Sequence, residues 1–79
     1  METFIKLLRD SEYGVEVPYA GAYMAYVTPD EERGGYHLSY CKGMMPPHAT
    51  GHADTAENAA EQVAKIAELS KARPITEEN

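Results

Sequence analysis

The residues of this chain that could bind a metal are concentrated in its middle, at Cys41, His48, His52 and Asp54. A zinc site needs four such ligands at about 2.0–2.3 Å, and recognisable sites have paired ligands at short spacing in both halves. Here Ala-Thr-Gly separates the last two histidines, which is typical of a loop, and no second cysteine is present. The pattern predicts solvated loop histidines and no metal site.

A nucleophilic site is the other chemistry to consider, with Ser39 and His37 two residues apart in an expected strand. Nucleophilic catalysis needs a base next to the nucleophile and a third group that orients the base. No third group and no oxyanion hole is marked in the sequence. Gly34 and Gly35 precede a strand and do not open a helix, so they do not form a phosphate-binding loop. We therefore expect a protein that is not an enzyme and holds no cofactor.

The size and composition of the chain agree with that expectation. A chain of 79 residues, expected to be one domain over 1–79, buries little apolar surface, and much of its 43% hydrophobic content is alanine and tyrosine. Such a core leaves no volume for a deep substrate cleft. The single cysteine, Cys41, cannot form an internal disulfide and is expected to be a small half-buried side chain. With no signal peptide and no membrane-spanning run, the sequence predicts a cytoplasmic protein.

The charge of the chain is its clearest bulk property. Thirteen acidic and seven basic residues give a formal net charge of −6. This balance does not suit direct binding of nucleic acid, which depends on Lys and Arg that release counterions. It suits a basic protein surface as the partner, because complementary potential raises the association rate. Acidity that serves only solubility remains the alternative.

Alternation of apolar and polar residues predicts an antiparallel sheet. The segment 3–8 fits either a strand or a short helix, and strands are expected at about 13–18, 22–28 and 35–41. Pro18 ends the first of these or marks it as an edge strand. The last two flank the turn-forming sequence PDEERGG and predict a hairpin.

A long helix is expected at about 55–72, followed by a tail at 74–79. Asp54 and Glu57 are spaced as a capping box, and Pro74 stops the helix. One buried stripe has helical spacing and comprises Ala56, Ala59, Ala60, Val63, Ile66, Ala67 and Ser70. The predicted fold class is therefore α+β: an antiparallel sheet of three to four strands with one long C-terminal helix packed on one face.

The residues most suited to contact a partner protein are acidic, sulfur-containing or aromatic. Acidic side chains occur in the hairpin loop and in the first turns of the helix. Exposed methionines adapt to protein surfaces, although here they could also cover the core beneath the helix. Tyrosines suit interfaces, and equally suit half-exposed strand positions. The candidates are Asp30, Glu31, Glu32, Glu57, Glu61, Met44, Met45, Tyr23 and Tyr26.

The second half of the chain resembles the HicB antitoxin family. The matching features are a Gly-Gly-Tyr that opens a strand, a proline-bearing loop with glycine, and Thr-x-Glu at the start of an alanine-rich helix. These features are carried by Gly34, Gly35, Tyr36, Pro46, Pro47, Gly51, Thr55 and Glu57. The resemblance implies a ββα unit and an antitoxin-like or other partner-binding regulatory role.

In size, acidity and lack of a catalytic set, the whole chain also resembles small phage-encoded anti-CRISPR proteins that act on type I systems. That resemblance implies an inhibitor that binds a subunit of the RNA-guided surveillance complex at basic surfaces meant for DNA, and so blocks target DNA binding. We therefore expect a non-enzymatic, acidic, protein-binding inhibitor, with the HicB-like role as the alternative.

Overall fold

The computed structural model describes residues 1–43 and 45–76, and Met44 and Glu77 to Asn79 lie outside the described residues. The helices are α1 (Glu2–Asp10) and α2 (Ala56–Ala64), with a 3₁₀ turn at Leu69–Lys71. The strands are β1 (Val15–Tyr19), β2 (Tyr23–Pro29), β3 (Tyr36–Lys42), β4 (Ala49–Ala53) and β5 (Arg73–Pro74). Neither helix is long and apolar enough to span a membrane within the part of the chain that the structure describes.

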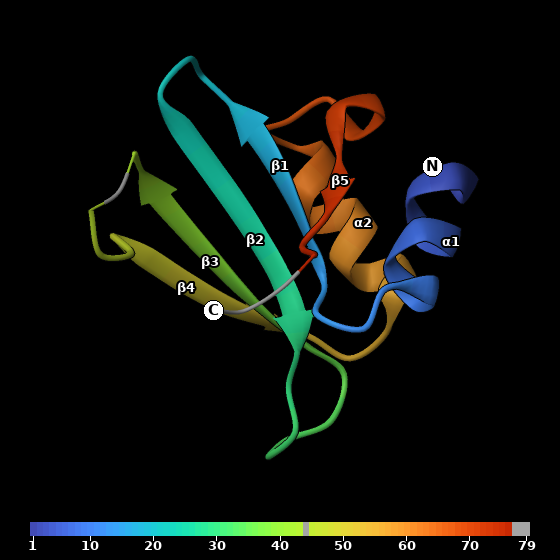
Figure 1. Ribbon diagram of the computed structural model, residues 1–79. Coiled ribbons are helices and arrows are strands. Elements are labelled where there is room, and N and C mark those ends of the chain that lie inside the picture. Colours follow the sequence, from blue (N-terminus) through green and yellow to red (C-terminus); the bar gives the residue numbers. More distant parts are fainter. Residues whose placement is uncertain (44, 77–79) are drawn as a thin grey trace.

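The five strands form one antiparallel sheet in the order β4-β3-β2-β1-β5. Figure 1 shows both helices on the same side of this sheet. The expected hairpin is confirmed, since β2 pairs with β3 from Tyr23 opposite Lys42 to Pro29 opposite Tyr36. The α+β class and the antiparallel sheet are therefore confirmed.

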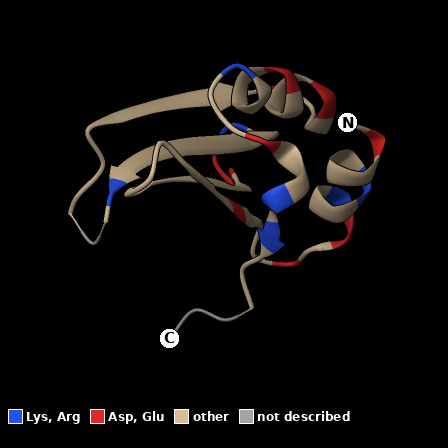
Figure 2. Ribbon diagram, turned by 90° about the horizontal axis from the view of Figure 1, so that it is seen from above, with Lys and Arg blue, Asp and Glu red and all other residues tan. Residues whose placement is uncertain are grey.

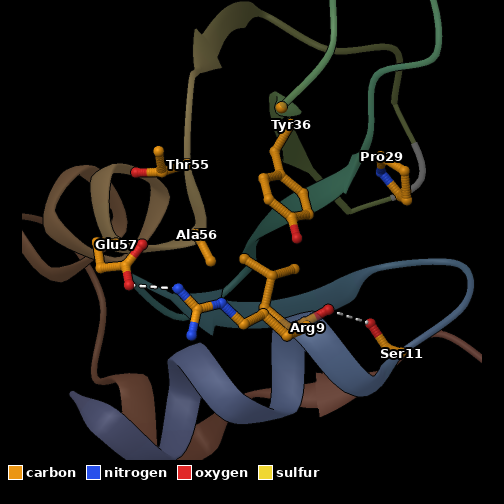
Figure 3. Close-up of a pocket in the computed structure, with 9 residues that line it drawn as sticks. Arg9, Ser11, Pro29, Tyr36, Thr55, Ala56 and Glu57 are labelled. Atoms are coloured by element: carbon orange, nitrogen blue, oxygen red, sulfur yellow. Dashed lines mark hydrogen bonds and ion pairs between the residues drawn. The ribbon is translucent and has the colours of Figure 1, made fainter.

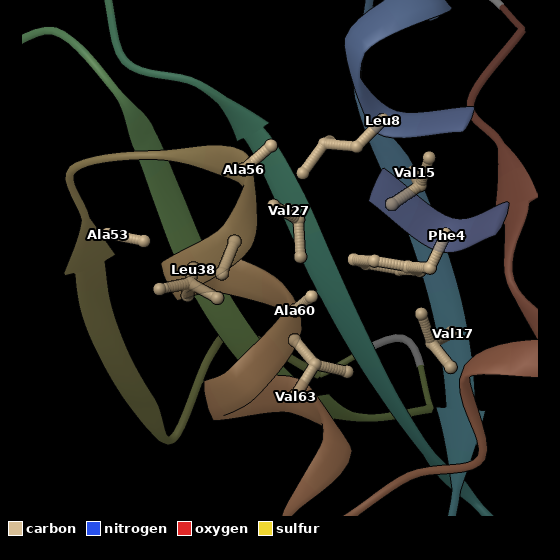
Figure 4. Packing of buried hydrophobic residues seen from close by; sticks show 11 residues of the cluster. Phe4, Leu8, Val15, Val17, Val27, Leu38, Ala53, Ala56, Ala60 and Val63 are labelled. Atoms are coloured by element: carbon tan, nitrogen blue, oxygen red, sulfur yellow. The ribbon is translucent and has the colours of Figure 1, made fainter. Parts of the chain in front are cut away.

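The core fills the space between the helices and the sheet (Figure 4). The sheet contributes Val15, Val17, Val27 and Leu38, each with no exposed surface. The helices contribute Phe4, Leu8, Ala56, Ala59, Ala60 and Val63. Three of the four buried α2 side chains are alanines, so the backbone of α2 can approach the strands closely. The first half of the expected buried stripe is thus confirmed.

The N-terminal segment is a helix, which resolves the ambiguity at 3–8. Phe4 and Leu8 are one helical turn apart and are both buried against the sheet, whereas Thr3 and Lys6 are exposed. An alternating strand would instead place Phe4 and Lys6 on one face. The expectation of one long C-terminal helix is therefore wrong, because the described residues form two nine-residue helices, α1 and α2.

Helix α2 begins and ends differently from the expected helix. Its N-cap is Thr55, whose hydroxyl accepts a hydrogen bond from the Asn58 amide at 3.0 Å, and Asp54 does not cap it. It ends at Ala64. An 18-residue helix would be about 27 Å long at 1.5 Å per residue, and the longest dimension of the molecule is 26 Å. The chain turns back instead and β5 pairs with β1, which leaves Ile66 45% exposed.

The sheet has five strands, so the expectation of three to four strands is wrong. The two missed strands are β4 and β5, whose sequences are typical of a loop and a tail. The β4 sequence ATGHA has no large β-forming residue, and its extended conformation depends on pairing with β3. β5 is two residues long and contains Pro74. Pro18 lies within β1 opposite Met24, beyond the two residues that pair with β5, so β1 is an edge strand at that position.

Cys41 is more deeply buried than a half-buried strand residue, with 7% of its surface exposed. It alternates with Leu38 and Tyr40 along β3 and lies on the face of the sheet opposite the helices. It pairs with Met24 of β2. The face that carries it also bears Tyr26, which is half-buried.

Candidate functional site

One end of the molecule collects most of the acidic side chains. The strand ends Pro29, Tyr36 and Ala53 are register partners, so the β2–β3 loop and the β4–α2 junction are neighbours at this end (Figure 1). The α1–β1 connection joins them there. Figure 2 shows that charged segments gather over the helices and their connections, while most of the sheet is uncharged. The acidic end comprises Asp10, Glu12, Asp30, Glu31, Glu32, Asp54 and Glu57, with Arg9 and Arg33 as its basic residues.

The hairpin loop at the acidic end is organised by Asp30. Its Oδ1 accepts hydrogen bonds from the backbone amides of Glu32 at 3.1 Å and Arg33 at 3.0 Å, and its carbonyl accepts from Gly34 at 2.8 Å. The bond from the Arg33 amide is the main reason that the pKa of Asp30 lies below its usual value. The Asp30 side chain is only 11% exposed. It is therefore an internal acceptor, and the contact surface of this loop is formed by the exposed Glu31 and Glu32.

His52 holds the same loop from β4. Its Nε2 lies 2.7 Å from the Gly34 carbonyl oxygen and 3.7 Å from Asp30 Oδ2, and its Nδ1 lies 3.6 Å from Asp54 Oδ1. The His52 ring is 15% exposed. The expectation that His52 is a solvated loop residue is therefore wrong. Its ring ties the β2–β3 loop to the strand beside it and limits the conformations that Glu31 and Glu32 can sample.

A shallow cleft of about 420 Å³ lies between α1 and α2 at the acidic end (Figure 3). Arg9 and Glu57 form an ion pair across it. A hydrogen bond from its own backbone amide is the main reason that the pKa of Glu57 is lowered, and Arg9 adds to the effect. Ser11 Oγ donates to the Leu8 carbonyl at 3.1 Å. Of the two acids predicted on α2, Glu57 and Glu61, both are exposed, and Glu57 is also held in an ion pair with Arg9.

The opposite end of the molecule carries an aromatic groove of about 370 Å³. It exists because α2 ends at Ala64 and does not cover the sheet at Tyr19 and Tyr40. These two rings meet edge to face, with centroids 6.3 Å apart. The groove is lined by Tyr19, Tyr40, His48, Gln62, Lys65 and Ile66.

Tyr23, one of the residues predicted to contact a partner, extends the aromatic groove into a wider cluster of rings. Tyr23 lies 5.4 Å from Tyr19 and 5.5 Å from His48, measured between ring centroids. Tyr26 is not part of this cluster, since it lies on the other face of the sheet. Met45 is 64% exposed and does not cover the core, and Met44 lies outside the described residues.

The groove was not found from the sequence because its residues come from β1, β3, the β3–β4 loop, α2 and the segment after α2. The signal that could have found part of it is the turn at Gly21. It puts Tyr19 opposite Tyr23 and, through β3, places Tyr40 next to them.

Within the ranges 1–43 and 45–76, no three His, Cys, Asp or Glu side chains are arranged to hold a metal ion. His52 and Asp54 are neighbours, but His48 lies by Tyr23 at the other end. No family model, curated protein or solved structure matches this chain.

Proposed function

We propose that the protein is a non-enzymatic binding protein that docks its acidic end on a basic surface of a partner protein. The observation that carries this proposal is the fixed presentation of Glu31 and Glu32. Both are exposed, and the loop beneath them is held by Asp30 and His52. A preorganised loop loses little conformational freedom on binding. Complementary charge then accelerates the encounter with a basic partner.

The partner class that suits this surface is a protein that normally holds phosphates with Lys and Arg. We propose a subunit of a type I RNA-guided surveillance complex, so that the bound inhibitor excludes target DNA from that surface. The net charge of −6 supports this choice, as does the general resemblance in size and acidity to anti-CRISPR proteins. The loop carboxylates would occupy positions that DNA phosphates otherwise take.

The experiment compares two double charge reversals that change the net charge equally. Glu31→Lys with Glu32→Lys alters the hairpin loop, and Glu2→Lys with Glu68→Lys alters exposed positions at the start of α1 and before the 3₁₀ turn. Binding to a purified type I surveillance complex is followed by biolayer interferometry at about 50 mM and 500 mM salt. Thermal melts confirm that both variants fold.

We expect the loop reversal to slow association roughly tenfold or more at low salt, with the loss shrinking at high salt as the field is screened. The control should stay within about twofold. Equal losses in both variants would mean that only net charge matters. Absence of wild-type binding at low salt would exclude this complex as the partner, and rescue from a neighbouring toxin on co-expression would favour the antitoxin role instead.

A further inference from the structure

The aromatic groove differs in charge from the rest of the protein. Among the described residues, no Asp or Glu lines it, whereas Lys65 and His48 do. Lys42 lies beside it, with its Nζ 5.9 Å from the centre of the Tyr23 ring. In the part of the chain that the structure describes, neither Lys42 nor Lys65 has a carboxylate within 4.0 Å. A chain of net charge −6 thus presents a locally basic surface opposite its acidic end.

The polar groups of the groove are available as hydrogen-bond donors. Burial is the main reason that the pKa values of Tyr19 and Tyr40 lie above the usual phenol value of 10.0, so both hydroxyls keep their protons at neutral pH. Gln62 Nε2 donates to the His52 carbonyl and to Asn58 Oδ1, both at 3.1 Å, which fixes the floor of the groove. Among the described residues, no hydrogen bond or ion pair engages the hydroxyls of Tyr19 and Tyr40 or the Lys65 ammonium, so these groups can donate to an acceptor from outside.

The walls of the groove are apolar and aromatic. Ile66 is one of the few large hydrophobic side chains that are exposed among the described residues, and it faces the edge-to-face pair Tyr19 and Tyr40. A volume of about 370 Å³ is at the small end of the range for ligand pockets. It suits one aromatic or large aliphatic side chain. Aromatic anchors in such pockets supply much of the energy of protein interfaces.

We propose that the aromatic groove docks a short acidic segment of a partner protein. One aromatic or large aliphatic side chain of that segment inserts between Ile66 and the two tyrosines, and a neighbouring carboxylate pairs with Lys65. Charge complementarity favours this occupant, because the described residues that line the groove include a cation and neutral donors but no carboxylate. The aromatic groove is separate from the acidic end, and it is proposed to bind an acidic partner where the acidic end binds a basic one. Failure of either proposal therefore leaves the other untouched.

The test uses the whole chain labelled with ¹⁵N and three acetylated, amidated peptides. Gly-Glu-Phe-Glu-Gly has the proposed chemistry, Gly-Lys-Phe-Lys-Gly reverses its charge, and Gly-Glu-Ala-Glu-Gly removes its anchor. Amide shifts are followed as each peptide is added at about 20 mM salt. We expect saturable shifts around Tyr40, His48 and Ile66 with the first peptide, and at least tenfold weaker binding of the other two.

Two exposed substitutions locate the contact. Lys65→Glu should weaken binding of the acidic peptide about three- to tenfold, as expected for reversal of a charge at the rim of an interface. Ile66→Ala should weaken it at least as much. Arg33→Glu changes the net charge equally at the acidic end and should have no effect. Equal binding of the basic peptide, or shifts away from the groove, would overturn the proposal. Concentration-dependent shifts of the groove without peptide would overturn it as well, since they would identify a second copy of the chain as the occupant.

Discussion

Substitution of Ala60 tests how closely α2 packs on the sheet. Ala60 is fully buried within the core cluster, where side chains are closely packed. Ala60→Leu adds three carbon atoms with no space to receive them, so α2 must move away from the strands. Overpacking of this kind costs about 1–3 kcal/mol. For a domain of this size each kcal/mol lowers Tm by about 4–8 °C, so the variant should melt roughly 4–24 °C below the wild type.

The matched control is Ala64→Leu, in the last turn of the same helix, where the side chain is exposed. Leucine and alanine differ little in helix propensity, and exposed substitutions usually change stability by less than about 0.5 kcal/mol. The melting temperature of this variant should therefore change by less than about 4 °C. Circular dichroism at 222 nm measures both melts. If the two variants melt within about 2 °C of each other, the close packing of α2 is wrong.

Two further predictions concern the loops at the acidic end. Gly35 has φ +70°, and a Cβ there would lie 2.3 Å from the Ala53 carbonyl oxygen, whereas at Gly34, with φ +80°, it would meet nothing within 4 Å. In urea titrations, Gly35→Ala should therefore lower the free energy of unfolding by about 1–3 kcal/mol more than Gly34→Ala does. Equal losses of stability in the two variants would contradict the register of β3 and β4. Because the folded pKa of Asp30 is lowered, its carboxylate stabilises the fold above the ordinary value of 3.8, and this stabilisation is lost as the pH falls through the lowered folded pKa. The Asp30→Asn variant should have a lower free energy of unfolding than the wild type at pH 6. The difference between the two free energies should narrow below pH 3.8. A difference that does not change with pH would refute the stabilising role of the Asp30 carboxylate.

The hairpin and the buried face of α2 could be predicted because their signals are local. Alternation around a glycine-bearing turn specifies β2 and β3, and alanine at helical spacing identifies the buried face of α2. The C-terminal end of α2 could not be predicted, because Ile66 and Ser70 continue the helical spacing and the stop depends on the return of the chain to β1. β4 also depends on its neighbour, since Gly51 and the alanines around it carry no strand preference of their own.

The candidate sites also combine features that local sequence predicts with features that depend on tertiary structure. Exposure of Glu31 and Glu32 follows from their place in a polar turn. Asp30 accepts local amide hydrogen bonds within its own turn, but its contact with His52, like the contact of Glu57 with Arg9, is provided only by the fold. The aromatic groove depends on tertiary structure throughout, because it joins five segments and exists only where α2 stops short.

The pairing of β1 with β5 has a bearing on the order in which the chain folds. β1 to β4 follow one another in a meander, so each pairing closes only a short loop. Val15 and Pro74 pair across about three quarters of the chain, and long loops are entropically costlier to close. We therefore expect the two-residue strand β5 to pair with β1 late in folding and to separate from it early in unfolding. The hairpin loop and His52, which holds it, belong wholly to the meander, so the positions of Glu31 and Glu32 do not depend on the pairing of β1 with β5.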